Sequence, residues 1–379
     1  MKSIPDTKIQ FIDLKAQQSR IRKNLDSRIA AVLNHGSYIL GPEVAELETA
    51  LARYVGIKHC ISCGNGTDAL LMALMAFDLK AGDAVFVPPF TFVATAEVVA
   101  LTGATPVFVD IDERTYNISP ECLDKAIERF RKTKSGLKAR GIIPVDLFGQ
   151  PADYDAISLV AKRHGLFVLE DAAQGFGGIY KGNKTCSFGD IAATSFFPAK
   201  PLGCYGDGGA IFTNDADVDA RLRSIRVHGQ GTDKYDNVRI GINGRLDSLQ
   251  AAVLLEKLSI FDDELVLRNN VARRYTQLLE KSVVTPYVSQ ECSSSWAQYS
   301  ILTENRDSVI AKLKAQNVPT AIYYTKPLHL QDAFKYLGHR RGDFPISERV
   351  AGRILSLPMH PYLDEATQIY IVDALKASV

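Results

Sequence analysis

The stretch LFVLEDAAQ (residues 166–174) contains the clearest of several short apolar runs in the chain. The runs are separated by longer segments with helical spacing, and several end in Pro, Asp or Gly. Short apolar runs that alternate with helices are typical of strands buried on both faces, as in mostly parallel sheets. The predicted strands are 84–88, 105–110, 141–146, 166–170, 191–197 and 209–213. The sequence therefore predicts an α/β fold around a mostly parallel central sheet.

Helical segments precede the predicted sheet. Apolar residues recur at three- and four-residue steps over 14–33, which predicts an amphipathic helix. Pro42 suits the first turn of a second helix, whose apolar residues continue to Tyr54. A third helix, 69–76, follows the glycine turn at 64–66.

The pattern changes again after Gly244. The elements predicted there are a long helical region from 246 to 279, strands at 297–303 and 320–324, and helices near 307–316 and at the C-terminus. We therefore expect two domains. Residues 1–250 would form a large domain with the N-terminal helical segment and the central sheet, and residues 251–379 a smaller C-terminal α/β domain.

Composition excludes several classes of protein. The 379 residues include 44 Lys and Arg against 43 Asp and Glu, a net charge of +1, so no basic excess supports binding to nucleic acid or to a membrane surface. The N-terminal stretch lacks the apolar core of a secretion signal, and prolines interrupt the most apolar region, 84–109. The six cysteines are scattered and need no disulfide framework. We expect a cytoplasmic globular protein.

Metal and serine-hydrolase chemistry find no support in the sequence. Cys60 and Cys63 have the spacing of a redox pair, but no second CxxC follows, so we expect buried structural thiols. The seven histidines show no metal-site spacing, and there is no GxSxG motif. We therefore expect no metal site.

Three local features carry candidate chemistry. Residues 64–68 (GNGTD) precede a helix, so their N–H groups and the Thr67 hydroxyl could face an anion, although such turns also cap helices that bind nothing. Asp171 ends a buried strand, where a carboxylate needs a protonated partner, or else caps a helix or pairs with an Arg. Lys200 lies between two prolines in a stiff apolar loop. Unless it is an ordinary solvated lysine, such a loop lowers its pKa and favours the unprotonated amine that forms a Schiff base.

Together these features resemble the DegT/StrS-type nucleotide-sugar aminotransferases, which use pyridoxal 5′-phosphate (PLP) on the fold-type-I aminotransferase scaffold. The matching stretches are YILGPEV (38–44), GNGTDAL (64–70), PFTFVATA (89–96), EDAAQ (170–174), 195–215, GINGRLD (241–247) and LSLPMHP (355–361). They cover nearly the whole chain in the family's order. The resemblance implies a PLP-dependent transaminase.

The resemblance also implies a role for each cofactor residue. Lys200 would hold PLP covalently, Asp171 would pair with the protonated pyridine nitrogen, and Gln174 would lie near the phenolic oxygen. Phe92 would cover one ring face, unless it is a plain core aromatic.

The phosphate of PLP is assigned by the same resemblance. Gly66, Thr67, Asp68 and Ser195 would hold it, together with Asn243 from a second subunit. The family pattern thus implies a homodimer in which two chains build each active site.

The implied reaction has two halves. L-glutamate would convert PLP to pyridoxamine 5′-phosphate, which would then aminate a ketone on a nucleotide-linked sugar, with Lys200 carrying the proton. Within the family, the sequence of residues 195–210 is most similar to that of enzymes that aminate the 3-keto group of UDP-2-acetamido-2-deoxy-ribo-hex-3-uluronate. Their product feeds a diamino-uronate of a surface polysaccharide such as lipopolysaccharide O-antigen.

Candidate substrate residues follow from this anionic acceptor. Arg245 could bind its carboxylate bidentately, or could instead form a buried salt bridge with Asp247 or another acid. Relatives commonly have His-Tyr-Pro where this chain has Tyr323-Tyr-Thr-Lys326, so Tyr323 could alter the acceptor pocket. Lys326 could add a positive group there or point to water. His329 matches a position near the substrate in relatives, or is a structural histidine.

Two alternatives remain open at this stage. Aminotransferases of 4-keto UDP-sugars or of 3-keto dTDP-6-deoxy sugars share every cofactor residue, so that set cannot separate them. A PLP-binding regulatory protein without turnover would also keep the fold, but the intact Lys200, Asp171 and Gln174 favour an enzyme.

Overall fold

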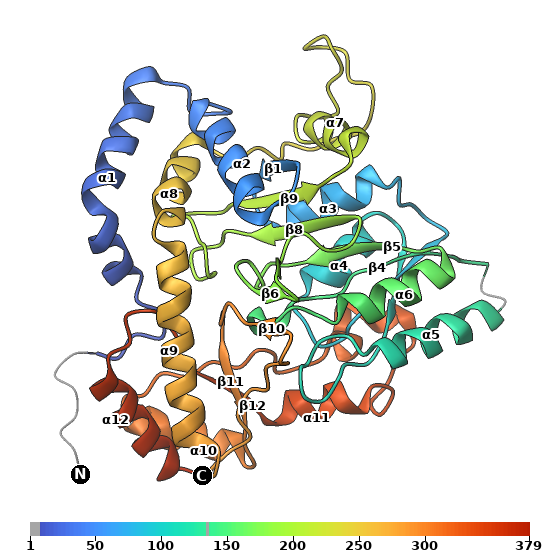
Figure 1. Cartoon of the computed structure of the whole chain (residues 1–379). Coiled ribbons are helices and arrows are strands. Elements are labelled where there is room, and N and C mark those ends of the chain that lie inside the picture. Colours follow the sequence, from blue (N-terminus) through green and yellow to red (C-terminus); the bar gives the residue numbers. More distant parts are fainter. Residues whose placement is uncertain (1–7, 134–135) are drawn as a thin grey trace.

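The computed structural model describes residues 8–133 and 136–379, and its centre is a seven-stranded sheet (Figure 1). The strand order is β1 (His59–Cys63), β9 (Gly209–Thr213), β8 (Ile191–Ser195), β5 (Phe167–Asp171), β4 (Lys138–Ile142), β2 (Asp83–Val87) and β3 (Thr105–Phe108). Every pairing from β8 to β3 is parallel, and only β9 runs antiparallel to its neighbours β1 and β8. The predicted α/β fold with a mostly parallel sheet is confirmed.

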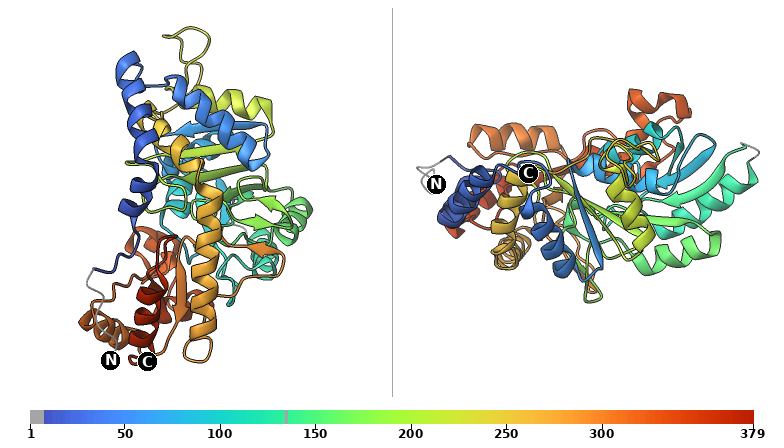
Figure 2. Two further views of the ribbon diagram at one scale, coloured as in Figure 1. Left: turned by 60° about the vertical axis from the view of Figure 1, so that its left-hand side comes forward. Right: turned by 90° about the horizontal axis from the view of Figure 1, so that it is seen from above.

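Alternating side chains of the strands face opposite layers of helices. Ile61, Val85 and Leu169 pack in a cluster with helices α3 (Gly66–Ala76), α4 (Ala94–Leu101) and α7 (Ala216–Ile225). Cys60 and Phe212 pack in a cluster with helices α2 (Pro42–Val55) and α8 (Ser248–Leu258). Because both faces are covered, the strands are apolar throughout, which explains why they appear as continuous apolar runs. Figure 2 shows these layers from two further sides.

The helices have the following bounds. They are α1 (Leu14–His35), α2 (Pro42–Val55), α3 (Gly66–Ala76), α4 (Ala94–Leu101), α5 (Pro120–Lys132), α6 (Tyr154–His164), α7 (Ala216–Ile225), α8 (Ser248–Leu258), α9 (Phe261–Leu279), α10 (Arg306–Ala315), α11 (Pro345–Arg353) and α12 (Glu365–Lys376). Short 3₁₀ turns are η1 (Leu147–Gly149), η2 (Leu328–Leu330) and η3 (Asp332–Leu337). The predicted N-terminal helices and the C-terminal ones are confirmed.

Two small sheets complete the fold. One contains β6 (Ile179–Tyr180), β7 (Asn183–Lys184) and β10 (Cys292–Ser293); the other pairs β11 (Tyr299–Leu302) with β12 (Ile354–Leu357). The second sheet shares an apolar cluster with the end of α9, α10 and α12. The strand predicted at 320–324 is wrong, because only Ala321 forms a bridge, to Ser356, before the chain turns.

Apolar packing shows where α8 belongs. Its residues Ala251 and Leu254 pack in the cluster of α2 and the central sheet, and the next cluster begins only at Val271 on α9. The domain boundary at residue 250 stays a prediction, and this packing argues for a boundary inside α9.

The structure also gives the state of the cysteines and shows whether any helix could span a membrane. All six cysteines are free, and Cys60 and Cys63 are buried, which raises the pKa of both thiols and confirms the prediction of structural thiols. In residues 8–133 and 136–379, no helix is long and apolar enough to cross a bilayer.

Candidate active site

The candidate site lies at the carboxyl edge of the sheet. The strand register aligns Cys63, Gly209 and Ser195 in one row, and Asp171 pairs with Ala193 two residues before Ser195. The ends of β1, β8 and β5 therefore bring the predicted anion turn, Ser195 and Asp171 to the same edge. Ligands of open α/β sheets bind at this edge.

Asp171 is a buried carboxylate that forms no ion pair within residues 8–133 and 136–379. Its side chain is only 3% exposed; it accepts hydrogen bonds from the Thr95 hydroxyl at 2.8 Å and from the Ala173 N–H at 3.2 Å. Burial raises the pKa of Asp171, and these neutral donors and the charge of Lys200 offset it only in part. The carboxylate can accept a further charged donor.

Lys200 is the cation whose charge acts on the Asp171 carboxylate. The residue is half-buried, and its backbone N–H donates to the Phe197 carbonyl at 2.8 Å, which fixes the loop after β8. Burial lowers the pKa of Lys200 to about 8, against a smaller opposing effect of Asp171. Across the described parts of the chain, no group forms a hydrogen bond or ion pair with its amine. The amine is therefore available to react.

Gly66, Thr67, Asp68 and Ser195, which we call the anion cradle, lie where α3 begins. The Asn65 side chain caps this helix by accepting the Asp68 N–H at 2.8 Å, while the first helical N–H groups have no partner within the helix. A Cβ on Gly66 would lie 2.6 Å from the Ser195 Cβ, so only glycine allows this approach. The helix N-terminus and the Ser195 hydroxyl thus favour an anion.

Gln174 connects the site to a later segment of the chain. Its carbonyl oxygen accepts the Phe148 N–H at 2.7 Å, and its amide donates to the Tyr324 hydroxyl at 2.9 Å. The Tyr324 ring lies 6.2 Å from that of Phe92, which is 52% exposed at this edge. An exposed aromatic ring here offers a flat surface to a planar ligand.

Two residues of this group were missed from the sequence. Thr95, which holds Asp171, is 76 positions away from it, and Tyr324 is 150 positions from Gln174. The motif PFTFVATA contains Thr95, so the family pattern was the only sequence signal for it. Tyr324 adjoins the predicted Tyr323, whose ring contacts it at 5.9 Å.

Asn243 and Arg245 form a separate pair. Asn243 is exposed, and its side-chain oxygen accepts a hydrogen bond from Arg245 Nε at 2.8 Å. The alternative of a salt bridge to Asp247 is wrong for the described chain, where Arg245 forms no ion pair and Asp247 is exposed. The terminal nitrogens of Arg245 remain free to bind an anion.

His329 is not brought together with these residues. It is 2% exposed, contacts Glu348 at 3.0 Å and packs against the Phe344 ring at 4.7 Å. Burial lowers the pKa of His329, and Glu348 offsets part of this effect. Lys326 is exposed to solvent. These contacts favour the structural alternative for His329.

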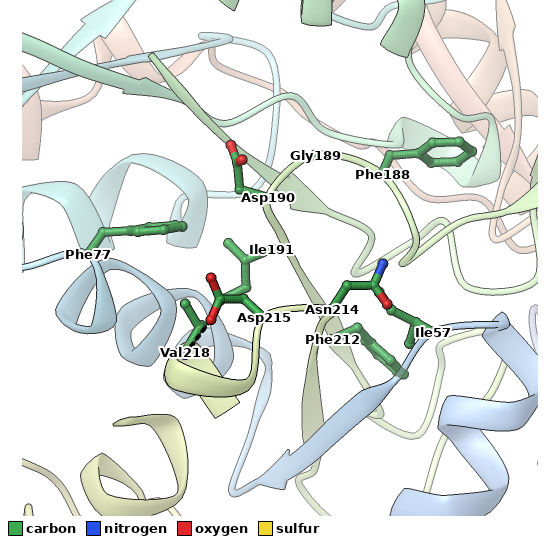
Figure 3. A pocket seen from close by; sticks show the side chains of 10 residues that line it. All are labelled: Ile57, Phe77, Phe188, Gly189, Asp190, Ile191, Phe212, Asn214, Asp215 and Val218. Atoms are coloured by element: carbon green, nitrogen blue, oxygen red, sulfur yellow. Dashed lines mark hydrogen bonds between the residues drawn. The ribbon is translucent and has the colours of Figure 1, made fainter. Parts of the chain in front are cut away.

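The opposite edge of the sheet also carries a hollow, of about 450 Å³, which Figure 3 shows. Its polar lining is already engaged: Asp190 accepts the Val168 N–H, Asn214 the Lys58 N–H, and Asp215 caps α7. Among the residues that the structure places, no group of His, Cys, Asp and Glu could hold a metal ion.

Comparison with known proteins extends this description. Residues 19–376 match the model of the DegT/DnrJ/EryC1/StrS aminotransferase family. The chain is 51% identical over 368 residues to UDP-2-acetamido-2-deoxy-3-oxo-D-glucuronate aminotransferase from Pseudomonas aeruginosa, covering 97% of this chain and 99% of the relative.

Two solved structures are similar over the whole fold. A DegT DnrJ EryC1 StrS aminotransferase from Brucella abortus is 54% identical, with a TM-score of 0.95 and coverage of 97% of this chain and 99% of that one. NtdA from Bacillus subtilis with bound cofactor PMP is 27% identical, with a TM-score of 0.87 and coverage of 99% and 85%.

Proposed function

The chain belongs to the DegT/DnrJ/EryC1/StrS aminotransferase family, and from this premise we propose that it aminates the 3-keto group of UDP-2-acetamido-2-deoxy-ribo-hex-3-uluronate, with L-glutamate as donor. It is a PLP-dependent nucleotide-sugar aminotransferase of fold type I. The observation that carries the proposal is the Lys200 amine, which has no partner among the described residues and interacts electrostatically with the buried carboxylate of Asp171, in a chain so similar to an aminotransferase of that sugar.

The residues at the carboxyl edge fit PLP group by group. Among the residues that the structure describes, Asp171 has no ion-pair partner and suits a protonated pyridine nitrogen, and the Lys200 amine has no partner and suits an aldehyde. The anion cradle suits a phosphate. When bound, PLP supplies an electrophilic carbon and a ring that accepts electrons from the substrate.

The protein's own groups then have distinct tasks. Asp171, held by Thr95, keeps a proton on the pyridine nitrogen, and Gln174, held between Phe148 and Tyr324, meets the phenolic oxygen. Phe92, whose ring is exposed at this edge, would cover one face of the cofactor ring and exclude water from it.

Lys200 acts as a proton carrier once its amine is free. A pKa of about 8 lets it take a proton from the substrate carbon and return it at the neighbouring cofactor carbon near neutral pH. The same group then serves both half-reactions, in opposite directions.

A homodimer would complete each site. The segment 228–242 stands out from the body at the top of Figure 1, and its Tyr235 and Ile240 are each 85% exposed, next to Asn243. Tyr38, Ile39 and Leu40 are also exposed, and Ile39 is bridged to Asp247. Exposed apolar side chains on the segment that leads to Asn243, and on the stretch bridged to Asp247, support contact with a partner chain at this face.

The acceptor is recognised by its negative charges. The free terminal nitrogens of Arg245 suit the carboxylate of a uronate, and Tyr323 lies beside Tyr324 at the cofactor residues. His329 has no place in this proposal because Glu348 and aromatic rings enclose it. The product would supply a diamino-uronate for lipopolysaccharide O-antigen synthesis in the cytoplasm.

Two experiments test the proposal. Borohydride reduction of the protein with PLP, followed by mass spectrometry, should locate a pyridoxyl group on Lys200, and a label on another residue would overturn the assignment. Release of 2-oxoglutarate from glutamate is then compared among 3-keto uronate, 4-keto UDP-sugar and 3-keto dTDP-6-deoxy-sugar acceptors. If the 4-keto UDP-sugar or the 3-keto dTDP-6-deoxy sugar gives faster release than the 3-keto uronate, that sugar is the substrate and the proposed one is wrong. A PLP-binding regulator would release none with any acceptor.

A further inference from the structure

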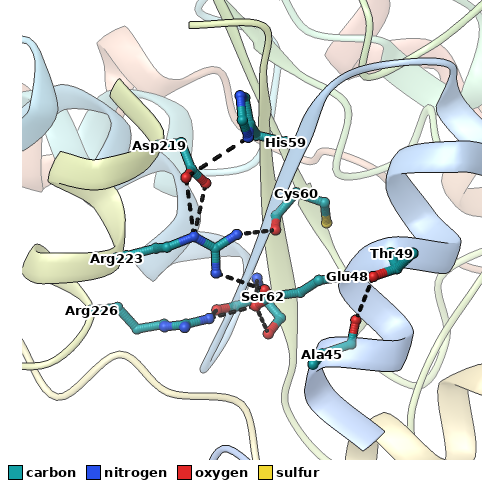
Figure 4. Close-up of polar contacts among 9 residues, drawn as sticks. All are labelled: Ala45, Glu48, Thr49, His59, Cys60, Ser62, Asp219, Arg223 and Arg226. Carbon is teal, nitrogen blue, oxygen red and sulfur yellow. Dashed lines mark hydrogen bonds and ion pairs between the residues drawn. The ribbon is translucent and has the colours of Figure 1, made fainter. Parts of the chain in front are cut away.

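A charged cluster covers the free edge of β1 (Figure 4). β1 is the outermost strand of the central sheet and pairs only with β9, so its other edge has no neighbouring strand. Glu48 of α2, Arg223 of α7 and Arg226, which directly follows α7, lie against this edge. An uncovered edge strand leaves backbone donors and acceptors without partners.

The side chains of this cluster replace a strand at Ser62. Glu48 Oε1 accepts hydrogen bonds from the Ser62 N–H at 2.9 Å and from its hydroxyl at 2.8 Å. Arg226 Nη1 donates to the Ser62 carbonyl at 3.0 Å and to Glu48 Oε1 at 2.5 Å. Ser62 lies two residues before Gly64, so this edge is fixed just where β1 leads into the anion cradle.

A backbone relay extends from Arg226 to the same turn. The Arg226 carbonyl accepts the Gly244 N–H at 3.0 Å, and the Gly244 carbonyl accepts the Gly64 N–H at 3.0 Å. A Cβ on Gly64 would lie 3.6 Å from the Arg245 carbonyl oxygen. Gly244 is thus held between the end of α7 and the turn that begins the cradle, and its neighbours in the chain are Asn243 and Arg245.

Charge balance keeps this arrangement intact. Burial alone would raise the pKa of Glu48, but Arg226, Arg223 and the Ser62 N–H outweigh it and hold the pKa below its usual value. Glu48 is therefore ionised at neutral pH, and both Glu48 and Arg226 are less than a tenth exposed. Loss of either charge would leave the other buried beside the turn.

We propose that Glu48 and Arg226 are positioning residues for the cofactor's phosphate, acting through Ser62 on the anion cradle and through Gly244 on the segment 243–245. The inference rests on the proposed function, in which the cradle and Asn243 hold that phosphate. Neither residue needs to touch the cofactor, because both act on the backbone that does.

The test compares PLP with pyridoxal, which lacks the phosphate. Dissociation constants of both are measured by titration with wild type, Arg226→Met and Arg223→Met. Arg226→Met should weaken PLP by about tenfold, the size of one weakened hydrogen bond to a charged group, and leave pyridoxal unchanged. Arg223 is the matched control, since it binds Glu48 Oε2 at 2.9 Å and the Cys60 carbonyl, but neither Ser62 nor Gly244. Its variant should keep the wild-type ratio of the two constants.

The outcomes separate positioning from general destabilisation. If Arg226→Met weakens PLP and pyridoxal equally, or neither of them, the proposal is wrong, whatever the thermal stability of the variant. If that variant does not fold, Arg226→Lys replaces it, because lysine keeps the charge but lacks the planar guanidinium. The ratio of the PLP and pyridoxal dissociation constants of this variant is then compared with that of wild type. If wild type itself binds the two ligands equally, the phosphate role of the cradle fails and the proposed function with it.

A mixed dimer tests the link to Asn243. One chain carries Lys200→Ala, so only the other chain can be labelled at Lys200 by PLP and borohydride. Arg226→Met keeps the backbone carbonyl that accepts the Gly244 N–H but removes the guanidinium that holds this backbone against Glu48 and Ser62. Adding it to the Lys200→Ala chain should raise the PLP concentration needed to label the intact chain, and no change would show that the guanidinium does not position Gly244. A mixed dimer with Asn243→Ala on the Lys200→Ala chain, in place of Arg226→Met, is the reference for loss of the contact from the partner chain. If that also has no effect, the shared site is wrong, while the comparison with pyridoxal still decides the role of Arg226.

Discussion

Glu48 on α2 and Asp171 at the end of β5 are both buried carboxylates beside the central sheet, yet the pKa of the first lies below its usual value and that of the second above it. Burial raises both pKa values; the difference is that Glu48 meets two guanidinium groups, whereas Asp171 meets a hydroxyl and an N–H. A paired charge stabilises the fold. A buried charge without a cation costs free energy that a bound ligand can recover.

Lys200, like Asp171, is a site residue without an ion-pair partner among the described residues. We expect the largest loss of turnover for Lys200→Ala. Turnover should fall by about 10⁴-fold or more, because both the covalent link and the proton carrier are lost. Apo-protein stability should not fall, since the amine has no partner to lose. Steady-state release of 2-oxoglutarate and thermal unfolding measure the two effects.

Lys257 is the matched control for that variant. Its pKa is also lowered by burial to about 8, and its amine has no hydrogen-bond partner but lies 4.3 Å from the centre of the Tyr205 ring. Lys257→Met should therefore keep turnover close to wild type. Equal losses in the two variants would mean that a buried lysine is needed only for folding.

Asp171→Asn should give the next largest effect, a fall in kcat of about 10³-fold. The neutral amide still accepts the Thr95 hydroxyl but no longer holds a proton on the cofactor's pyridine nitrogen. Because the folded-state pKa of Asp171 is raised, its ionisation destabilises the apo-protein above the pKa of the unfolded state. The apo variant should thus be as stable as wild type or more so at pH 7. Lower apo stability would show that Asp171 is paired after all.

Much of this contrast was visible in the sequence. The buried strands were predicted because Val, Ile and Phe fill both faces, and following their carboxyl ends led to Asp171, Ser195 and the 64–68 turn. β1 was not predicted as a strand, because the short run Cys60–Cys63 includes a serine whose backbone is satisfied by the side chains of Glu48 and Arg226. Strand β4 ends at Ile142, before the predicted limit, since Pro144 has no N–H to donate.

The partners of the site residues could not be predicted. Thr95 and Tyr324 reach the site only through the fold, and neither a hydroxyl on a helix nor a tyrosine after a short turn has a local signature. His329 shows the converse. Its position in the family pattern left a substrate role open beside a structural one, and only the structure reveals Glu348, which pairs with the histidine.

Glu48→Gln tests the paired side of the contrast and should lower the free energy of unfolding by about 3 kcal/mol, because Arg226 is left buried without its carboxylate. Glu46→Gln is the control on the same helix. Glu46 pairs with Arg28 at 3.1 Å but is half exposed, so its loss should cost no more than about 1 kcal/mol. Urea unfolding of both apo variants measures the difference, and similar losses would mean that burial adds nothing to the Glu48 network.

The smallest predicted effect is the pH dependence of PLP attachment, which involves both Lys200 and Asp171. Only the free amine of Lys200 attacks an aldehyde, so covalent attachment of PLP should quicken by about tenfold per pH unit below its pKa of about 8 and level off above it. Asp171 raises this pKa, so Asp171→Asn should move the levelling-off to lower pH. The unfolded chain keeps the lysine proton to a higher pH than the folded one, so apo wild type should gain stability relative to Lys200→Met as pH rises from about 8 to about 10. A rate that still climbs at pH 10 would mean that the amine is solvated, and the contrast with the Glu48 cluster would then rest on Asp171 alone.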